Sequence, residues 1–190
     1  VEIDTVTRTN NVFIHSGYVK QGTLKVGDIV QSRVDKISRR GVQAHHTSTH
    51  LLQSALKQVI DADISQAGSL VDFDRLRFDF YCSRSITTSE LAQIEKLINC
   101  WISEAHTLEV QEMTLEYAKQ VGAVAMFGEK YGKVVRVVDV PGVSMELCGG
   151  THVTNTIELG LFKVISESGI ASGIRRIEAV AGPAALDYFN

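Results

Sequence analysis

The apolar residues of this chain follow two patterns in succession. In residues 1–41, short apolar runs such as residues 26–34 are separated by closely spaced glycines, a pattern typical of strands joined by tight turns. These runs predict a small β-barrel-like domain over residues 1–41 that is incomplete. The pattern then changes: Leu52, Leu56 and Val59 recur at three and four residues, which predicts a helix with one apolar face.

The remainder of the chain, which with this helix makes up a second domain over residues 42–190, mixes predicted strands and helices. A long helix begins near Thr87, Thr88 or Ser89, any of which would cap its first turn. The other predicted elements are strands over residues 64–71, 76–81, 134–140, 144–147, 161–166 and 174–180, and short helices over residues 114–121 and 184–188. Because they do not follow strict βαβ alternation, the predicted fold class is α+β.

Composition narrows the class of protein further. The chain has 190 residues, 44% of them hydrophobic, and a net charge of −3, so no overall positive field attracts nucleic acid. Its three cysteines argue against a disulfide framework and favour a reducing, intracellular compartment, either the cytoplasm or an organelle. No apolar run reaches the length of a membrane span, and we expect no membrane partner. A first residue other than methionine is compatible with a segment excised from a longer protein.

Two short motifs about a hundred residues apart carry the candidate chemistry. His46 and His50 are four residues apart in the predicted helix, so both rings leave the same face. Cys148 and His152 have the same spacing, and the glycines between them let the chain bend. One sulfur and three nitrogens suit tetrahedral zinc. His45 competes with His46, but it lies five residues from His50 and points away from that face.

The role of the predicted zinc stays open at this stage. The first motif resembles the zincin pattern His-Glu-x-x-His, but Thr47 and Ser48 occupy the gap and the catalytic glutamate is absent, which disfavours a peptidase. A site with four protein ligands is usually structural, because no position remains for water. The sequence selects no general base.

Several motifs in one order resemble the editing domain of alanyl-tRNA synthetases. The matching segments are residues 46–52 (HTSTHLL), 65–71 (SQAGSLV), 76–80 (LRFDF), 127–132 (FGEKYG), 146–153 (ELCGGTHV) and 173–179 (GIRRIEA). The resemblance implies a small β domain followed by a two-layer α/β editing domain of the threonyl/alanyl type. It also implies hydrolysis of the ester that joins serine or glycine to tRNA(Ala), since a synthetic site for alanine rejects both poorly.

The resemblance also implies roles for particular residues. Thr49 would recognise the serine hydroxyl, whereas without the resemblance it reads as a threonine bonded to its own helix. Gln66 and Ser69, which flank Gly68 in the loop after the helix of the first motif, would hold the substrate or position water, whereas without the resemblance they read as turn residues. The backbone N–H groups of Gly149 and Gly150 would stabilise an oxyanion. The candidate contacts to tRNA are Arg77, Lys130, Arg175 and Arg176.

The expected partner is therefore the acceptor end of tRNA(Ala) that carries serine or glycine, together with other synthetase domains if the chain is excised from a synthetase. Two alternatives remain open. The chain could be a free-standing deacylase that edits in trans, or a zinc-stabilised module that binds tRNA without catalysis. The acidic net charge predicts weak tRNA binding by this chain alone.

Overall fold

The computed structural model describes residues 1–10, 12–125 and 131–189, and it divides the chain into two compact units, Val1–Val34 and Asp35–Asn190. In the first unit, strand β1 (Glu2–Thr9) pairs antiparallel with strand β2 (Val12–Tyr18). Every described residue of this unit is exposed. A division into domains at residues 41 and 42 stays a prediction.

The sequence-based prediction for the first unit is only partly confirmed. Its described residues contain a two-stranded sheet and no closed barrel, and residues 26–34 form no strand. The apolar side chains of Val26 and Ile29 lie in solvent. An isolated hairpin has no second layer against which an apolar run can pack, so local pattern alone does not make residues 26–34 a strand.

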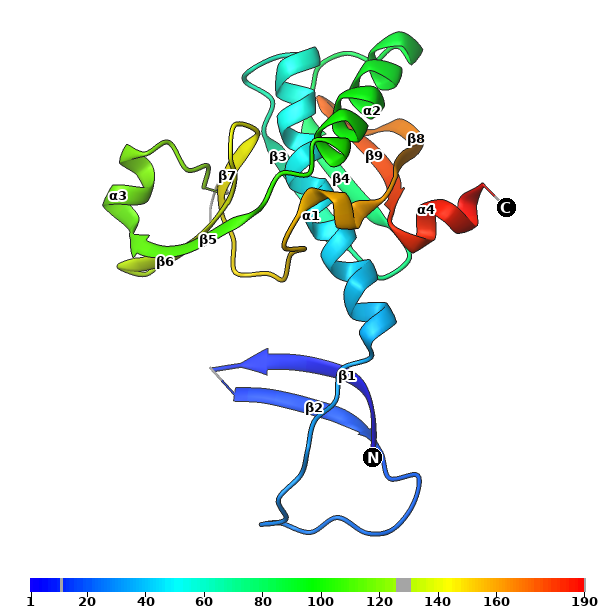
Figure 1. Cartoon of the computed structure of the whole chain (residues 1–190), viewed down its shortest axis with the longest axis vertical. Helices are drawn as coiled ribbons and strands as arrows, with labels where there is room; N and C mark the ends of the chain where they lie inside the picture. The colour runs from blue at the N-terminus through cyan, green and yellow to red at the C-terminus, as the bar shows by residue number, and fades with distance from the viewer. Residues whose placement is uncertain (11, 126–130, 190) are drawn as a thin grey trace. The chain divides into compact units, whose positions relative to one another are not determined.

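The second unit contains a four-stranded antiparallel sheet (Figure 1). The strand order is β3-β4-β9-β8. The bounds are β3 Gln66–Val71, β4 Leu76–Tyr81, β8 Phe162–Ala171 and β9 Ile174–Ala181. The predicted strands match these bounds closely, although β8 continues to Ala171. The register shifts between Gln66 and Gly68, which marks a β-bulge in β3.

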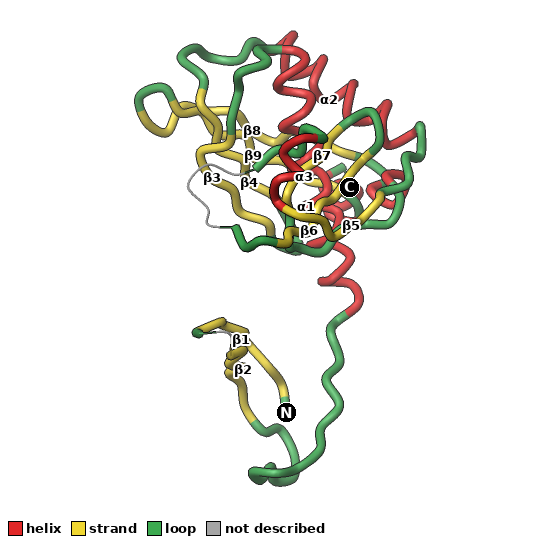
Figure 2. The backbone as a smooth tube through the Cα atoms, turned by 90° about the vertical axis from the view of Figure 1, so that its left-hand side faces the viewer, coloured by secondary structure: helices red, strands yellow, loops and turns green. Residues whose placement is uncertain are grey.

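Helices α1 (Lys36–Val59) and α2 (Thr88–Ser103) pack against this sheet and against each other (Figures 1 and 2). The fully buried side chains at their contact with the sheet form one apolar core, and they include Leu51, Leu52, Leu56, Phe78, Phe80, Ile94, Ile98, Phe162 and Ile177. The second unit is thus an α+β fold, in agreement with the predicted class.

Helix α1 begins earlier than the apolar pattern predicts. Its N-cap is Asp35, whose Oδ1 accepts a hydrogen bond of 2.7 Å from the backbone N–H of Ser38. Residues 36–40 at the start of α1 are exposed and, apart from Ile37, polar, so they form no apolar face that a hydrophobic pattern would reveal. As a consequence, His46 and His50 lie in the middle of the helix and not in its first turns.

A second, three-stranded antiparallel sheet has the order β5-β6-β7. Its strands are β5 (Glu109–Thr114), β6 (Val134–Val140) and β7 (Ser144–Leu147), and helix α3 (Leu115–Gln120) packs against it. The remaining elements are the 3-10 helix η1 (Thr156–Leu159) and helix α4 (Pro183–Tyr188). In the described part of the chain, no helix combines the length and the apolar character that a membrane crossing requires.

Candidate metal centre

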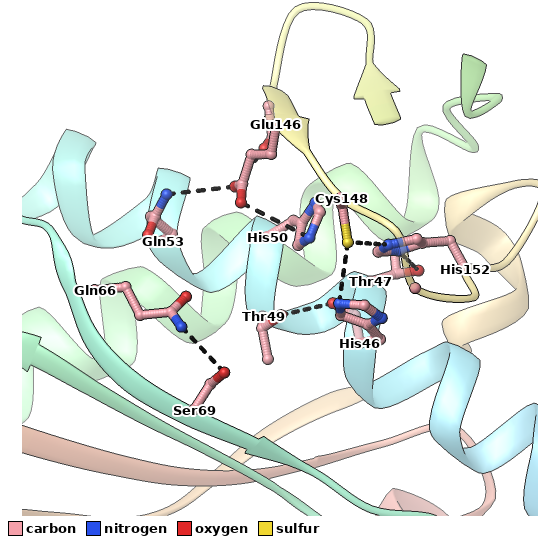
Figure 3. A network of polar contacts seen from close by, with 12 residues as sticks. His46, Thr47, Thr49, His50, Gln53, Gln66, Ser69, Glu146, Cys148 and His152 are labelled. Carbon is pink, nitrogen blue, oxygen red and sulfur yellow. Dashed lines mark hydrogen bonds and ion pairs between the residues drawn. The ribbon is translucent and has the colours of Figure 1, made fainter. Parts of the chain in front are cut away.

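The buried stretch of α1 presents the first pair of candidate ligands. His46 and His50 project from one side of the helix toward the chain that follows β7 (Figure 3). His50 is buried and His46 is half-buried. The two histidines, four residues apart in the helix, therefore share one face, as the sequence predicts.

The second pair comes from the loop after β7, and Arg136 on the neighbouring strand β6 holds this loop in shape. Its Nη1 donates hydrogen bonds of 2.7 Å to the carbonyl of Cys148 and 2.8 Å to the carbonyl of Gly150. The backbone N–H of Cys148 donates in turn to the carbonyl of Arg136, at 3.0 Å. Arg136 thus fixes the loop at two points, a role that the sequence-based interpretation missed, since nothing in a linear pattern relates it to Cys148.

The four side chains of the two motifs meet at one point. Each of His46, His50, Cys148 and His152 offers one ligand atom, and these atoms all lie within 4.8 Å of one another. The Sγ of Cys148 lies 3.3 Å from the Nε2 of His46 and 3.3 Å from the Nε2 of His152. Tetrahedral zinc, with bonds of about 2.3 Å to sulfur and about 2.0 Å to nitrogen, separates such atoms by about 3.5 Å. The four residues can therefore hold one metal ion.

Burial keeps the imidazoles neutral, which is the form that binds metals. Burial lowers the pKa of His50 to about 3, and His46 adds to this effect. Burial, followed by the nearby His50 and His46, lowers the pKa of His152 to about 2. The Nδ1 of His50 is buried and has no hydrogen-bond partner among the described residues. A buried ring nitrogen without a hydrogen-bond partner is costly.

Two of these rings each have a further polar side chain next to them. The Oγ1 of Thr47 lies 3.1 Å from the Nδ1 of His152. The carboxyl of Glu146 lies 3.7 Å from the Nε2 of His50 (Figure 3). Groups in such positions orient metal ligands and adjust their basicity.

The carboxyl group of Glu146 lies beside the four candidate metal ligands. It accepts hydrogen bonds from Ser144 at 2.9 Å and from Gln53 at 3.4 Å. Burial raises the pKa of Glu146 to about 7, while the hydrogen bond from Ser144 acts in the opposite direction. Because His50 stays neutral, the contact between them is not an ion pair near neutral pH. The sequence did not single Glu146 out, although its position two residues before Cys148 in an extended segment gives both side chains the same face.

His45 does not belong to the cluster, as the spacing predicts. It is fully buried, with its Nδ1 2.8 Å from the carbonyl of Asp72, while its Nε2 accepts a 3.1 Å hydrogen bond from the backbone N–H of Ala181. Both nitrogens therefore serve to fasten α1 to the sheet. Cys100 stands next to Trp101 in an apolar helical pattern, which predicts a core position, but the structure shows otherwise. It is exposed on α2, because the buried side of that helix is formed by Ile98, Trp101 and their neighbours.

The predicted substrate residues lie on α1 and on the strand β3 that packs against it (Figure 3). The hydroxyl of Thr49 is buried and donates a 2.7 Å hydrogen bond to the carbonyl of His46, the bond to its own helix that the sequence left open. Gln66 and Ser69 lie in β3, where the Nε2 of Gln66 donates to the Oγ of Ser69 at 3.1 Å. The bulge beside Gln66 changes the direction of the strand at this point.

Three of the four candidate tRNA contacts are arginines, and each of them lies against a carboxylate of the same unit. Arg175 makes two hydrogen bonds with Glu167, at 2.6 and 2.7 Å. Arg176 makes two with Asp79, at 2.7 and 2.9 Å, and Arg77 lies 3.6 Å from the same carboxylate. Lys130 lies outside the described residues. A role for any of the four in binding phosphate stays a prediction.

Comparison with known proteins now identifies the class. Residues 135–178, which run from β6 through the Cys148 loop to β9, match the family described as "Threonyl and Alanyl tRNA synthetase second additional domain". The second unit thus contains an editing-type domain of these synthetases.

Sequence relatives identify the synthetase. Over 190 residues the chain is 69% identical to an alanine–tRNA ligase of Synechococcus sp. (strain RCC307), covering 100% of this chain and 22% of the relative. It is 68% identical to the alanine–tRNA ligase of Parasynechococcus marenigrum (strain WH8102) and 65% identical to that of Prochlorococcus marinus (strain MIT 9211), in each case over 100% of this chain and 21% of the relative. The chain belongs with the alanine–tRNA ligases, and it spans about a fifth of the length of these relatives.

Proposed function

We propose that this chain is the editing part of an alanine–tRNA ligase and that it hydrolyses Ser-tRNA(Ala) and Gly-tRNA(Ala). The observation that carries the proposal is the meeting of His46, His50, Cys148 and His152 at one point beside a buried carboxyl group. An enzyme that separates alanine from glycine, which is smaller, and from serine, which adds only a hydroxyl, needs a second site that removes its errors. An editing-type domain is where that site is expected.

The metal we propose is zinc, because three neutral imidazoles and one cysteine sulfur form a donor set that zinc prefers in proteins. Bound there, zinc supplies a positive charge that polarises an ester carbonyl or a water molecule. Burial of the three histidines keeps them in the neutral form that this role requires. Glu146, with a pKa near 7, is the candidate for proton transfer on chemical grounds, because a carboxyl group with that pKa both accepts and donates a proton near neutral pH.

Thr49 is our candidate for recognition of serine, and its hydrogen bond defines how. The hydroxyl already gives its proton to the carbonyl of His46, so toward a substrate its oxygen acts as an acceptor. A serine ester can donate its hydroxyl proton to that oxygen, and an alanine ester cannot. Gln66 and Ser69 are our candidates for holding the aminoacyl group or a water molecule, since their side chains already bond to each other on the adjacent strand.

The loop backbone supplies candidate donors for a developing oxyanion. Arg136 binds the carbonyls of Cys148 and Gly150, and in trans peptides the following N–H groups point the opposite way. The N–H groups of Gly149 and Thr151 therefore point away from the guanidinium. This supports the predicted role of Gly149, whereas the predicted role of the N–H of Gly150 rests on the resemblance alone.

We further propose an intracellular location and a complex with the acceptor end of tRNA(Ala), with other domains of the ligase supplying most of the phosphate contacts. The bidentate pairing of Arg175 and Arg176 with carboxylates is consistent with weak tRNA binding by this chain alone. A free-standing deacylase is the less favoured variant, because the named relatives are ligases of which this chain matches a part.

One observation favours a second candidate function. The cluster already offers four protein ligands, and a closed set of four is typical of structural zinc. On this alternative, the metal stabilises the loop after β7 and the chain presents tRNA without cleaving the ester. The two candidates differ in a direct assay.

The test is hydrolysis of Ser-tRNA(Ala) and Ala-tRNA(Ala) by the zinc-loaded chain, by Cys148→Ala and by the control Cys100→Ala. Cys100 is exposed and outside the cluster, so it controls for loss of a thiol. We expect the unchanged chain to hydrolyse Ser-tRNA(Ala) rapidly and Ala-tRNA(Ala) only slowly. Cys100→Ala should keep this activity, and Cys148→Ala should lose it. If tRNA binds and zinc is present but neither ester is cleaved, the structural alternative holds.

A further inference from the structure

We infer that Thr47 is a positioning residue for the metal centre, whose hydroxyl accepts the Nδ1–H of His152 and so leaves the Nε2 lone pair for the metal. The inference rests on the proposed metal site and gives a role to a residue that the zincin comparison treated only as the replacement of a glutamate. Thr47 lies between the two histidines of α1 and is buried in the helix, where threonine has no intrinsic helix-forming advantage.

The contacts of Thr47 cross between the two motifs. Its side chain is completely buried, and its Oγ1 lies 3.1 Å from the Nδ1 of His152. The same oxygen accepts a 3.2 Å hydrogen bond from the backbone N–H of Val153. One hydroxyl on α1 thus meets both the ring of a ligand and the chain next to it, more than a hundred residues away in sequence.

The geometry selects one tautomer of His152. The Nε2 of the ring lies 3.3 Å from the Sγ of Cys148, on the side where the four ligand atoms meet. A neutral imidazole carries its proton on one nitrogen only, and the nitrogen that binds a metal must be the other one. A proton on Nδ1 needs an acceptor, and the second lone pair of the Thr47 oxygen is the one placed to receive it.

The neighbouring residue provides a matched control. Ser48 is also completely buried on α1, but its Oγ has no hydrogen-bond partner among the described residues. Ser48→Ala therefore removes a buried hydroxyl from the same turn without touching the cluster. Thr47→Val removes the hydroxyl and keeps the shape of the side chain, and Thr47→Ser keeps the hydroxyl.

The experiment measures zinc affinity by competition with a chromophoric chelator, using the zinc ion alone as probe. We expect Thr47→Val to bind zinc about 10- to 100-fold more weakly, the usual effect of losing a group that orients a ligand. Thr47→Ser and Ser48→Ala should stay close to the unchanged chain. Equal affinity in Thr47→Val would overturn the inference, whereas a lack of zinc binding by the unchanged chain would overturn the metal site itself.

A second measurement tests the inference on the unchanged chain as well as on the variants. Long-range proton–nitrogen NMR spectra of the metal-free chain report which nitrogen of His152 carries the proton. We expect the Nδ1–H form in the unchanged chain and in Ser48→Ala, with a shift toward the Nε2–H form in Thr47→Val. A merely structural role for Thr47 would leave this equilibrium unchanged. Finding the Nε2–H form in the unchanged chain would refute the inference even if Thr47→Val does not fold.

Discussion

Gly149 and Gly150 are adjacent in the loop between Cys148 and His152, yet their surroundings differ. A Cβ atom at residue 149 would meet no atom within 4 Å, whereas one at residue 150 would collide with the imidazole of His46. Neither glycine has a positive φ, so an added methyl group has no backbone cost at either position. Gly150 is small because a metal ligand occupies the space next to it.

This difference predicts opposite outcomes for two similar variants. Gly150→Ala should push His46 out of place and weaken zinc binding by about tenfold or more, as loss of a ligand's support does. Gly149→Ala should leave zinc affinity unchanged and alter the free energy of unfolding by no more than about 0.5 kcal/mol. Chelator competition and thermal unfolding measure both effects, and equal zinc affinity in the two variants would contradict the packing described for this loop.

Thr49 allows a prediction about specificity. Thr49→Val keeps the size of the side chain and removes the proposed acceptor for the serine hydroxyl. We expect kcat/KM for Ser-tRNA(Ala) to fall by roughly three- to tenfold, the value of one hydrogen bond, with little change for Ala-tRNA(Ala). Thr49→Ser should retain the preference for serine. An unchanged ratio of the two rates in Thr49→Val would assign the recognition of serine to another group.

At the scale of elements, the start of α2 shows how local chemistry fixes a boundary. Thr87 and Glu90 form a capping box, in which the hydroxyl of Thr87 accepts from the backbone N–H of Glu90 and the carboxylate of Glu90 accepts from that of Thr87. Arg84 adds two hydrogen bonds to the same carboxylate, at 2.7 and 2.9 Å. The sequence predicted this boundary because all of its determinants lie within seven residues.

The capping box also predicts a dependence of stability on pH. The hydrogen bonds from Arg84, followed by those from Thr87, lower the pKa of Glu90 from 4.5 to about 2. A carboxyl group whose pKa is lowered by folding stabilises the folded state above its unfolded pKa, and this contribution is lost as the pH falls through its folded pKa. Unfolding in urea should therefore become easier between about pH 4.5 and about pH 2.

The matched variants isolate this contribution. Glu90→Gln should show a smaller loss of stability over that pH range than the unchanged chain. Glu116→Gln, which changes an exposed glutamate in the first turn of α3, should follow the unchanged chain. Parallel curves for Glu90→Gln and the unchanged chain would show that the ionised carboxylate does not stabilise α2.

The strands that were wrongly predicted from the sequence differ from the others for an identifiable physical reason. Strands β4, β6 and β7 have strong apolar patterns and the predicted bounds. Strand β5 was not predicted because most of its residues are polar and exposed, so pairing with β6, and not its own pattern, makes it a strand. Residues 26–34 show the opposite error, an apolar pattern without a partner strand in the described part of their unit.

At the scale of the whole molecule, the metal centre depends on contacts that no local pattern contains. The spacing of each motif made its residues candidate ligands, but their meeting requires α1 to pack against β7. Arg136 and Thr47, which hold the loop and one of its rings, became visible only through that packing. The resemblance of several motifs in one order identified the synthetase, and the comparisons with alanine–tRNA ligases agree with it.

The measurement that tests the account most directly is X-ray absorption at the zinc edge of the zinc-loaded chain. One ion per chain, with one sulfur at about 2.3 Å and three nitrogens at about 2.0 Å, is the result that four ligands from the two motifs predict. In Cys148→Ala the sulfur contribution should disappear. A spectrum with nitrogen and oxygen neighbours only, or one that Cys148→Ala leaves unchanged, would contradict a shared metal centre and remove the basis of the proposed editing site.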